Sequence, residues 1–453
     1  MTILKQTANF IVNSAFTKEE QELALHHLVD TCSALICGCH SYEGRKLLNA
    51  FNEEKDLFGD KGALNEIFLY SSLIRLTEVD DIHLPSCTTP GSVVVPTILA
   101  FVPYKNNISF ETITDALIVG YEMLTRLGRV IDGANILSKG IWPSYFCASF
   151  GAAATAARLL GLSEEETVHA LTLSLTLSAG GVSRSSVDTF RWLALGKAAE
   201  SGAFAASMAS RGFKGDPEML ENNWIEKTYG IAADSSKLVQ DLGVNHAIND
   251  MSMKPYCSAK QVIPALHGFE NIMKKGVLYD DIEEIKITVP NEFVKMTDHG
   301  AFDRVSSLTS IPYQLALLLF EREDLFDLNR SSLLETPEVL GFMKKITIVG
   351  DRSYSKLYPE KWVSKVECYT KTGVVTEYIE ASTGDPEKRL NKEDILDKNK
   401  KLLMNVPEKE SIMNNFSKLL IDDCDKQSIL NLTKDINRMI FEVTYQSQLG
   451  SKL

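Results

Sequence analysis

The sequence lacks several features that would place it in a class of protein at once. No apolar run reaches the roughly 20 residues that a membrane-spanning helix requires. No basic block is long enough to form a nucleic-acid-binding arm. Neither a Walker phosphate-binding loop nor a dinucleotide-binding fingerprint is present. We therefore expect no nucleic-acid partner, no membrane and no nucleotide.

Cysteine is also sparse, with eight residues scattered over the chain. The first residues, MTILKQTANFIVNSAF, contain no apolar core of signal-peptide length. We therefore expect free thiols, a reducing compartment and a cytoplasmic location. One close grouping, Cys37-Gly-Cys39-His40, is not followed by a second ligand pair at zinc-like spacing. We expect small buried residues on a helix there, and no metal.

Charge and composition are those of an acidic globular protein. Lys and Arg total 47, Asp and Glu total 60, and the net charge is −13. Such a surface repels nucleic acid and anionic membranes, although a locally basic pocket can still bind a small anion. A chain of 453 residues is too long for one hydrophobic core, so we expect two domains.

Helical patterns dominate the first part of the chain. Capping-box patterns follow Thr17 and Ser163, each with a Glu three residues later. Alanine-rich segments at residues 150–160 and 196–211 are each followed by glycine, a frequent helix terminator. Small residues on so many helices predict close helix packing in a compact, all-helical domain.

The pattern changes after about residue 270. Alternating, β-branched segments at residues 282–290 and 344–349 predict strands. Residues 363–379 predict a β-hairpin with a glycine in its turn, and a helix is expected at residues 311–321. This part of the chain is therefore expected to form a smaller α+β domain.

From about Lys392 the helical patterns return, and the charged run at residues 394–401 is expected to face solvent. The last helices are expected to pack on the first domain. The predicted fold class is mainly α with a smaller α+β lid. The domains are expected to be a discontinuous helical domain, residues 1–268 and 396–453, and the lid, residues 269–395.

The stretch TEVDDIHLPSCTTPGSVVVP places carboxylates, a histidine and a hydroxyl-rich turn before an apolar helix. Asp81 with His83, or Glu78, is a candidate general base. The Pro90-Gly91 turn can offer backbone N–H groups at a helix N-terminus to a carboxylate. The alternative is a helix cap beside a solvated acidic loop. Three hydroxyl side chains are candidate substrate ligands: Ser86, Thr88 and Thr89.

Two aromatic and basic positions stand at later helix starts. Trp142, in GIWPSYFC, is a candidate pocket wall, and the alternative is a buried structural Trp. Arg191, in FRWLALGK, is suited to bidentate hydrogen bonding with a carboxylate, and the alternative is a surface Arg. The loop at residues 180–186 offers backbone freedom and hydroxyl groups nearby in sequence.

Three further candidates lie in the second half of the chain. Lys254 and Lys260 flank a Pro-Tyr-Cys turn and are candidate ligands of an anionic substrate, and the alternative is a pair of solvated lysines. Tyr313, in SSLTSIPYQ, stands at a helix start, where a core Tyr is the alternative. Basic and hydroxyl groups at several helix starts, in an acidic protein, favour a small polycarboxylate as the ligand.

These segments, in this order, resemble the MmgE/PrpD family over nearly the whole chain. They are the Asp-Asp-x-His stretch, the Trp-Pro-Ser turn before GAAATAARLLGLSEEE, the Phe-Arg-Trp helix, Met-Lys-Pro-Tyr and Ser-Ile-Pro-Tyr-Gln. The family includes 2-methylcitrate dehydratase, cis-aconitate decarboxylase and iminodisuccinate epimerase. The resemblance implies a large helical domain, a smaller α+β lid, a homodimer and no cofactor.

The sequence departs from the family pattern at positions that carry proton chemistry. Glu78 stands where the pattern has Asp, and Arg191 where it has Lys. Imidazole can shuttle a proton near neutral pH, whereas Arg binds carboxylates but is a poor proton donor. Lys254 and Tyr313 are retained, and Lys260 falls where many members carry a basic residue. Two or three histidines of the pattern are replaced, by Thr89, Trp142 and Ala194.

We therefore predict an enzyme that moves a proton at a carbon next to a carboxylate of a small di- or tricarboxylate. The reaction is a dehydration, a hydration or an epimerisation. In this scheme Arg191, Lys254 and Lys260 bind carboxylates, and Tyr313 or Lys254 is the acid. Two alternatives stay open, a non-catalytic carboxylate-binding relative and a cis-aconitate decarboxylase-like enzyme.

Overall fold

The computed structural model describes residues 1–53, 62–105, 107–178, 190–329, 334–407, 409–421 and 424–450, with side chains as far as residue 444 except at residue 190. The predicted loop at residues 180–186 lies outside the described residues. The chain forms two compact units, one of Met1–Met251 with Asn391–Leu453 and one of Ser252–Leu390. Within the described ranges, no helix is both long and apolar enough to cross a membrane.

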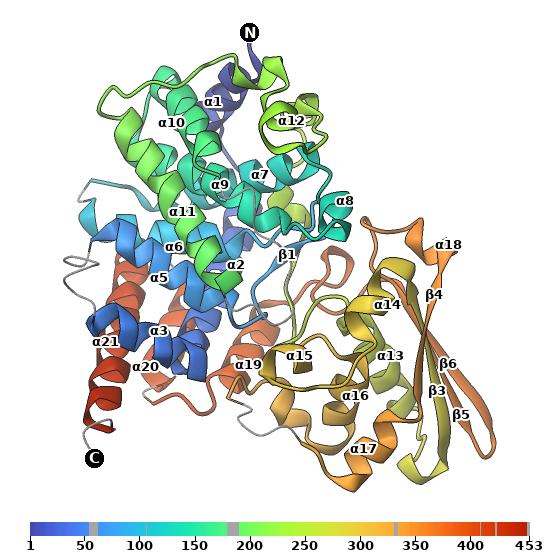
Figure 1. Cartoon of the computed structure of the whole chain (residues 1–453). Helices are drawn as coiled ribbons and strands as arrows, with labels where there is room; N and C mark the ends of the chain where they lie inside the picture. Colours follow the sequence, from blue (N-terminus) through green and yellow to red (C-terminus); the bar gives the residue numbers. More distant parts are fainter. Residues whose placement is uncertain are drawn as a thin grey trace. The chain divides into compact units, whose positions relative to one another are not determined.

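The first unit is built almost entirely from helices (Figure 1). Its elements are α1 (Ile3–Asn13), α2 (Lys18–His40), α3 (Tyr42–Glu53), α5 (Ala63–Arg75), β1 (Ile82–His83), α6 (Gly91–Phe101), η1 (Val102–Tyr104), α7 (Phe110–Val130), α8 (Gly133–Ser138), α9 (Pro143–Leu160), α10 (Glu164–Thr176), α11 (Phe190–Ala209), η2 (Met219–Asn222), α12 (Trp224–Tyr229), η3 (Ser235–Leu238), η4 (Ala247–Asp250), α19 (Lys392–Leu402), α20 (Lys409–Leu420) and α21 (Lys426–Gly450). The short strand β2 (Met251–Ser252) stands where the two units divide.

Local signals at the helix ends are confirmed. Thr17 accepts the backbone N–H of Glu20, whose carboxylate accepts the N–H of Thr17 in return, which completes the first predicted capping box. Ser163 forms the same reciprocal pair at the start of α10. Gly161 ends α9 in the left-handed conformation, with a φ of 66° that glycine adopts without strain.

Helix α9 lies at the centre of the first unit and packs against α7, α11, α6 and α10. Its alanine-rich faces permit very close approach. A Cβ added to Gly202 of α11 would lie 2.0 Å from the carbonyl oxygen of Ser149 on α9. The small residues seen in the sequence therefore set the spacing of the two helices that carry Trp142 and Arg191.

The C-terminal helices belong to the first unit, where α19 and α20 pack against α2 and α21 packs against α3 (Figure 1). Lys398 of α19 is buried and donates to Asp30 Oδ1 of α2 at 2.5 Å. The expectation that residues 394–401 form a solvated face is therefore wrong at this position, because a buried carboxylate on α2 compensates the charge.

The second unit contains a four-stranded sheet in the order β4-β3-β5-β6. Strands β3 and β4 are parallel and the other neighbours are antiparallel, with Ile287 opposite both Ile348 and Val366. The predicted strands, hairpin and helix are all present. The elements are α13 (Ile263–Lys274), η5 (Tyr279–Asp281), β3 (Ile282–Pro290), α14 (Asn291–Thr297), α15 (Arg304–Ser307), α16 (Ile311–Phe320), η6 (Arg322–Leu325), α17 (Pro337–Met343), β4 (Ile346–Asp351), α18 (Arg352–Ser355), β5 (Ser364–Thr370), β6 (Gly373–Ile379) and η7 (Pro386–Lys388).

The predicted fold class, mainly α with a smaller α+β part, is confirmed. The second unit begins at residue 252, earlier than the expected start at residue 269. The reason is that α13 packs on β5 and β6, so the segment before the first long strand shares the core of the sheet. Lys254 and Lys260 therefore belong to the second unit.

Candidate functional site

Predicted residues His83, Ser86 and Thr88 meet in a closed turn that follows β1. The N–H of His83 donates to the carbonyl of Thr88 at 2.8 Å. His83 Nδ1 lies 2.8 Å from Ser86 Oγ, which lies 2.7 Å from Thr88 Oγ1, and all three side chains are fully buried. Burial, with a smaller effect of Arg129, lowers the pKa of His83 to about 3. The imidazole is therefore neutral near pH 7 and is a poor proton acceptor.

Asp81 is fully buried, and both of its carboxylate oxygens are bonded within the first unit. Oδ1 accepts the N–H of Gly91 at 2.8 Å. Oδ2 accepts the hydroxyl of Tyr121 at 2.6 Å and lies 2.9 Å from His27 Nδ1. The N–H of Gly91, which the sequence suggested would face a ligand, is thus used by the chain's own carboxylate. Asp81 ties α2, α6 and α7 together.

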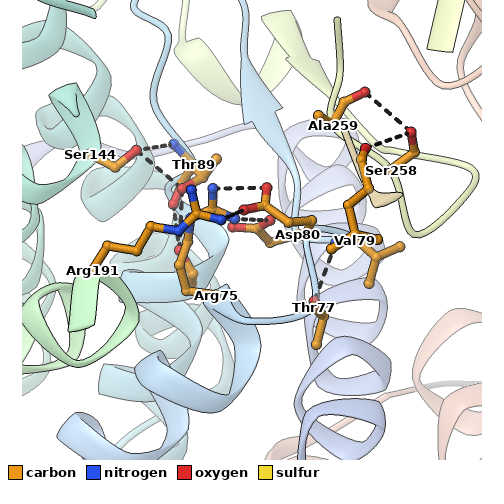
Figure 2. A network of polar contacts seen from close by, with 12 residues as sticks. Arg75, Thr77, Val79, Asp80, Thr89, Ser144, Arg191, Ser258 and Ala259 are labelled. Atoms are coloured by element: carbon orange, nitrogen blue, oxygen red, sulfur yellow. Dashed lines mark hydrogen bonds and ion pairs between the residues drawn. The ribbon is translucent and has the colours of Figure 1, made fainter. Parts of the chain in front are cut away.

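Two buried arginines hold Glu78 between them. Arg75, the last residue of α5, donates through Nη2 to Glu78 Oε2 at 2.9 Å and through Nη1 to Asp80 Oδ1 at 3.0 Å. Arg191, in the first turn of α11, donates through Nη2 to Glu78 Oε1 at 3.2 Å. Figure 2 shows the two guanidinium groups and Asp80. The backbone of Glu78 has a φ of 56°, a strained value of the kind that gathers at functional sites.

Trp142 forms one wall of this group. It is partly buried and precedes α9, and its ring centroid lies 5.2 Å from the guanidinium carbon of Arg191 and 5.7 Å from that of Arg75. The ring of Tyr145, in the first turn of α9, lies 6.0 Å from that of Trp142. We call the following six residues the arginine cluster: Arg75, Glu78, Asp80, Trp142, Tyr145 and Arg191.

Three donors of the arginine cluster have no acceptor in the part of the chain that the structure describes. Arg75 Nε, Arg191 Nε and the hydroxyl of Tyr145 are buried and have no hydrogen-bond partner among the described residues. An unsatisfied buried polar group costs about 1–3 kcal/mol, so native proteins pair nearly all of them with protein, water or ligand. Three such donors, on α5, α9 and α11, are suited to the oxygen atoms of a small anion.

Tyr145 keeps its proton at neutral pH. Burial raises the pKa of its phenol to about 12, although the nearby charges of Arg75 and Arg191 act to lower it. The phenol is therefore a hydrogen-bond donor in this cluster and not a base.

Thr89 is bonded within the first unit as well. Its N–H donates to Ser144 Oγ at 3.0 Å, and its Oγ1 lies 3.1 Å from the same oxygen (Figure 2). Ser92 Oγ lies 3.4 Å from Thr89 Oγ1. These contacts join the loop before α6 to the first turn of α9, the same turn that carries Tyr145.

The remaining predicted residues lie in the second unit. Lys260 is almost fully buried and forms an ion pair with Asp385, whose other oxygen accepts the N–H of Ser382 at 2.6 Å. Its ammonium group is thus bonded within its own unit. Lys254 is 2 % exposed. The hydroxyl of Tyr313 accepts the N–H of Leu334 at 2.9 Å. Within the described residues, no group of three or more His, Cys, Asp or Glu is placed to hold a metal ion.

The structure brings together the predicted residues Glu78, Trp142 and Arg191, whereas Arg75, Asp80 and Tyr145 were not among the predicted site residues. The sequence did carry a signal for Arg75 and for Tyr145. Arg75 is the lone charge in the apolar segment SSLIRL, and Tyr145 follows Trp142 by three residues at a helix start. A charge at the end of an apolar helix indicates a buried partner.

Comparison with known proteins agrees with the two-unit fold. The MmgE/PrpD N-terminal domain matches residues 5–233, and the MmgE/PrpD C-terminal domain matches residues 256–418. The cis-aconitate decarboxylase-like protein oryM of Aspergillus oryzae is 25% identical over 218 residues, which cover 44% of this chain and 45% of that protein. The cis-aconitate decarboxylase of Aspergillus terreus is 29% identical over 174 residues, 37% of this chain and 35% of that protein.

The cis-aconitate decarboxylase of Homo sapiens is 28% identical over 157 residues, 34% of this chain and 32% of that protein. The chain thus spans less than half the length of these curated relatives. The two family domains, in contrast, extend over most of the sequence. The chain belongs to the MmgE/PrpD family.

Proposed function

We propose that this chain is an enzyme that binds a small di- or tricarboxylate and moves a proton at the carbon beside a carboxylate. The arginine cluster is the observation that carries the proposal. It combines two buried guanidinium groups, an aromatic wall and three donors without acceptors among the described residues.

Directed donors, and not net charge, favour a carboxylate here. Glu78 and Asp80 already balance the charges of Arg75 and Arg191. Attraction of an anion therefore depends on N–H and O–H groups at fixed positions, and the planar guanidinium group matches the geometry of a carboxylate. A ligand with several oxygens on a small frame can satisfy more than one of these donors.

The family supports the class of chemistry. Relatives that share 25–29% identity with parts of this chain are named as cis-aconitate decarboxylases or as similar to one. Dehydration, hydration, epimerisation and decarboxylation of such acids all add or remove a proton at a carbon beside a carboxylate. We therefore place this chain among the lyases or epimerases of carboxylic acids, with the particular reaction left to experiment.

Among the predicted bases of the first unit, Glu78 is the best placed. Asp81 has both oxygens bonded, and the pKa of His83 is about 3. Glu78 Oε1 is bonded to Arg191. A substrate carboxylate that takes the donors of Arg191 would release this oxygen for proton abstraction. Lys254 and Tyr313, expected to supply the acid, remain predictions.

Proton NMR in deuterated water tests the proposed reaction. The panel is citrate, 2-methylcitrate, cis-aconitate, malate, tartrate and iminodisuccinate. We expect deuterium to enter beside a carboxylate, or an alkene signal to change, for at least one compound. Arg191→Gln should slow the exchange by about 100-fold or more, because a charged donor to the ligand is lost. Lys197→Gln is the matched control, since Lys197 is exposed on the same helix and should leave the rate unchanged.

A second candidate is a carboxylate-binding protein without catalysis. The neutral His83 and the fully bonded Asp81 favour it, because the pKa of His83 is about 3 and both oxygens of Asp81 are already bonded within the first unit. Binding of a panel member without deuterium exchange would support this candidate. Neither binding nor exchange would show that the ligand class is wrong.

A further inference from the structure

Tyr145 is the least explained side chain of the arginine cluster. It lies in the first turn of α9, and only 1 % of it is exposed. Phe would fill the same volume without a polar atom, yet the hydroxyl is buried and has no partner among the described residues. Native interiors pair nearly all such groups with protein, water or ligand.

The surroundings of the phenol determine what can bond to it. The charged groups that act on it are Arg75, Arg191, Glu78 and Asp80. The arginines are donors and cannot accept its hydrogen. Glu78 accepts from the guanidinium groups through both of its carboxylate oxygens, and Asp80 accepts from Arg75 through Oδ1. An oxygen atom on a ligand held by the two arginines would stand beside the phenol and could accept its hydrogen.

We infer that Tyr145 donates its hydroxyl hydrogen to an oxygen of the bound carboxylate, beside the donors of Arg75 and Arg191, and thereby assists the reaction. This inference rests on the proposed function. When the proton leaves the neighbouring carbon, negative charge develops on the oxygens of the carboxylate. A fixed donor in a buried site then binds more tightly than it does in the ground state, which lowers the barrier.

The protonation state of the phenol fits this role. Burial raises its pKa to about 12, with Arg75 and Arg191 acting in the opposite direction. The hydroxyl therefore keeps its hydrogen throughout the neutral range.

Tyr145→Phe isolates the hydroxyl, because the ring remains. We expect the deuterium-exchange rate at saturating ligand to fall about 100-fold, the typical effect of removing one donor to a developing oxyanion. The dissociation constant should rise only about 10-fold, the effect of one hydrogen bond in the ground state. Tyr121→Phe is the matched control, since its hydroxyl donates to Asp81. It should lower thermal stability and leave the dissociation constant at the wild-type value.

A spectroscopic measurement separates ligand contact from a structural role. In protein labelled with ¹³C at the phenolic carbon of tyrosine, the Tyr145 resonance is identified by its loss in Tyr145→Phe. We expect it to move when ligand saturates the wild-type chain. A resonance that stays in place, with binding and exchange unaltered in the variant, overturns the inference and leaves the proposed function standing.

The other outcomes are also decisive. Binding without exchange in the wild-type chain overturns the proposed reaction, and the dissociation constant and the resonance shift then decide whether Tyr145 contacts the ligand. A wild-type chain that binds no member of the panel overturns both.

Discussion

The buried imidazole of His83 makes a quantitative prediction about stability in acid. In the unfolded chain a histidine has a pKa of about 6.5, whereas burial lowers the pKa of His83 in the folded chain to about 3. Below pH 6.5 the unfolded state therefore binds a proton that the folded state does not. The stability that His83 contributes is fully present above pH 6.5 and is lost as pH falls toward 3. Between pH 7 and pH 5 this one group should remove about 2 kcal/mol.

Urea unfolding at the two pH values measures this loss. Burial also lowers the pKa of His26, His40 and His267 to about 4. The free energy of unfolding of the wild-type chain should therefore fall by more than the contribution of His83 alone. The variant His83→Asn isolates the pH-dependent stability that His83 alone contributes. Its amide can reproduce the contact of Nδ1 with Ser86 and does not titrate. Between pH 7 and pH 5 the variant should lose about 2 kcal/mol less than the wild type.

Equal losses in the two proteins would refute this reasoning. That result would mean that His83 gains its proton in the folded chain near neutral pH. His83 would then be available as a proton acceptor, and its predicted pairing with Asp81 as the base would return to consideration.

Two further substitutions test the packing and charge assignments by urea unfolding. Gly91→Ala should destabilise the chain by about 1–3 kcal/mol, because the new Cβ would lie 2.7 Å from Asp81 Oδ1, whereas Gly62→Ala, with no atom within 4 Å, is its near-neutral control. If the two variants are equally stable, Gly91 and the carboxylate of Asp81 are not in close contact. Lys260→Met should destabilise by about 3–5 kcal/mol by leaving the buried carboxylate of Asp385 without its cationic partner, and adding Asp385→Asn should recover much of the loss. If Lys260→Met is as stable as the wild type, the ion pair with Asp385 contributes little, and the ammonium group of Lys260 is available for a ligand.

Features of the fold that depend on neighbouring residues could be predicted from the sequence. The capping boxes at Thr17 and Ser163 need only residues three apart, and the strand at residues 282–290 shows its β-branched alternation locally. The hairpin at residues 364–379 was visible for the same reason. These signals depend on residues close together in the sequence and not on tertiary contacts.

Features that depend on distant partners were not predictable. Lys398 stands in a charged run that looks solvated, but its partner Asp30 is 368 positions away. Arg191 and Glu78 are 113 positions apart and meet only because α5 and α11 pack together. No local pattern reports such a pairing, so a buried charge looks like a surface charge in the sequence.

The candidate site shows the same division. Resemblance to the family singled out Glu78, Trp142 and Arg191, and these meet in the arginine cluster. The sequence located the start of a helix at Gly91, but it did not show that Asp81 bonds to that N–H. It likewise did not show that His83 is fully buried. Burial lowers the pKa of His83 to about 3, so the imidazole is a poor base near pH 7. Those facts follow from burial and geometry.

Calorimetric titration of the six carboxylates into the wild-type chain and Arg191→Gln tests the central claim most directly. We predict that at least one compound binds the wild type and that Arg191→Gln weakens this binding by about 100-fold or more, because a charged donor to the ligand is removed. Lys197→Gln should bind as the wild type does. Binding that is equally tight in Arg191→Gln would contradict a carboxylate site at the arginine cluster.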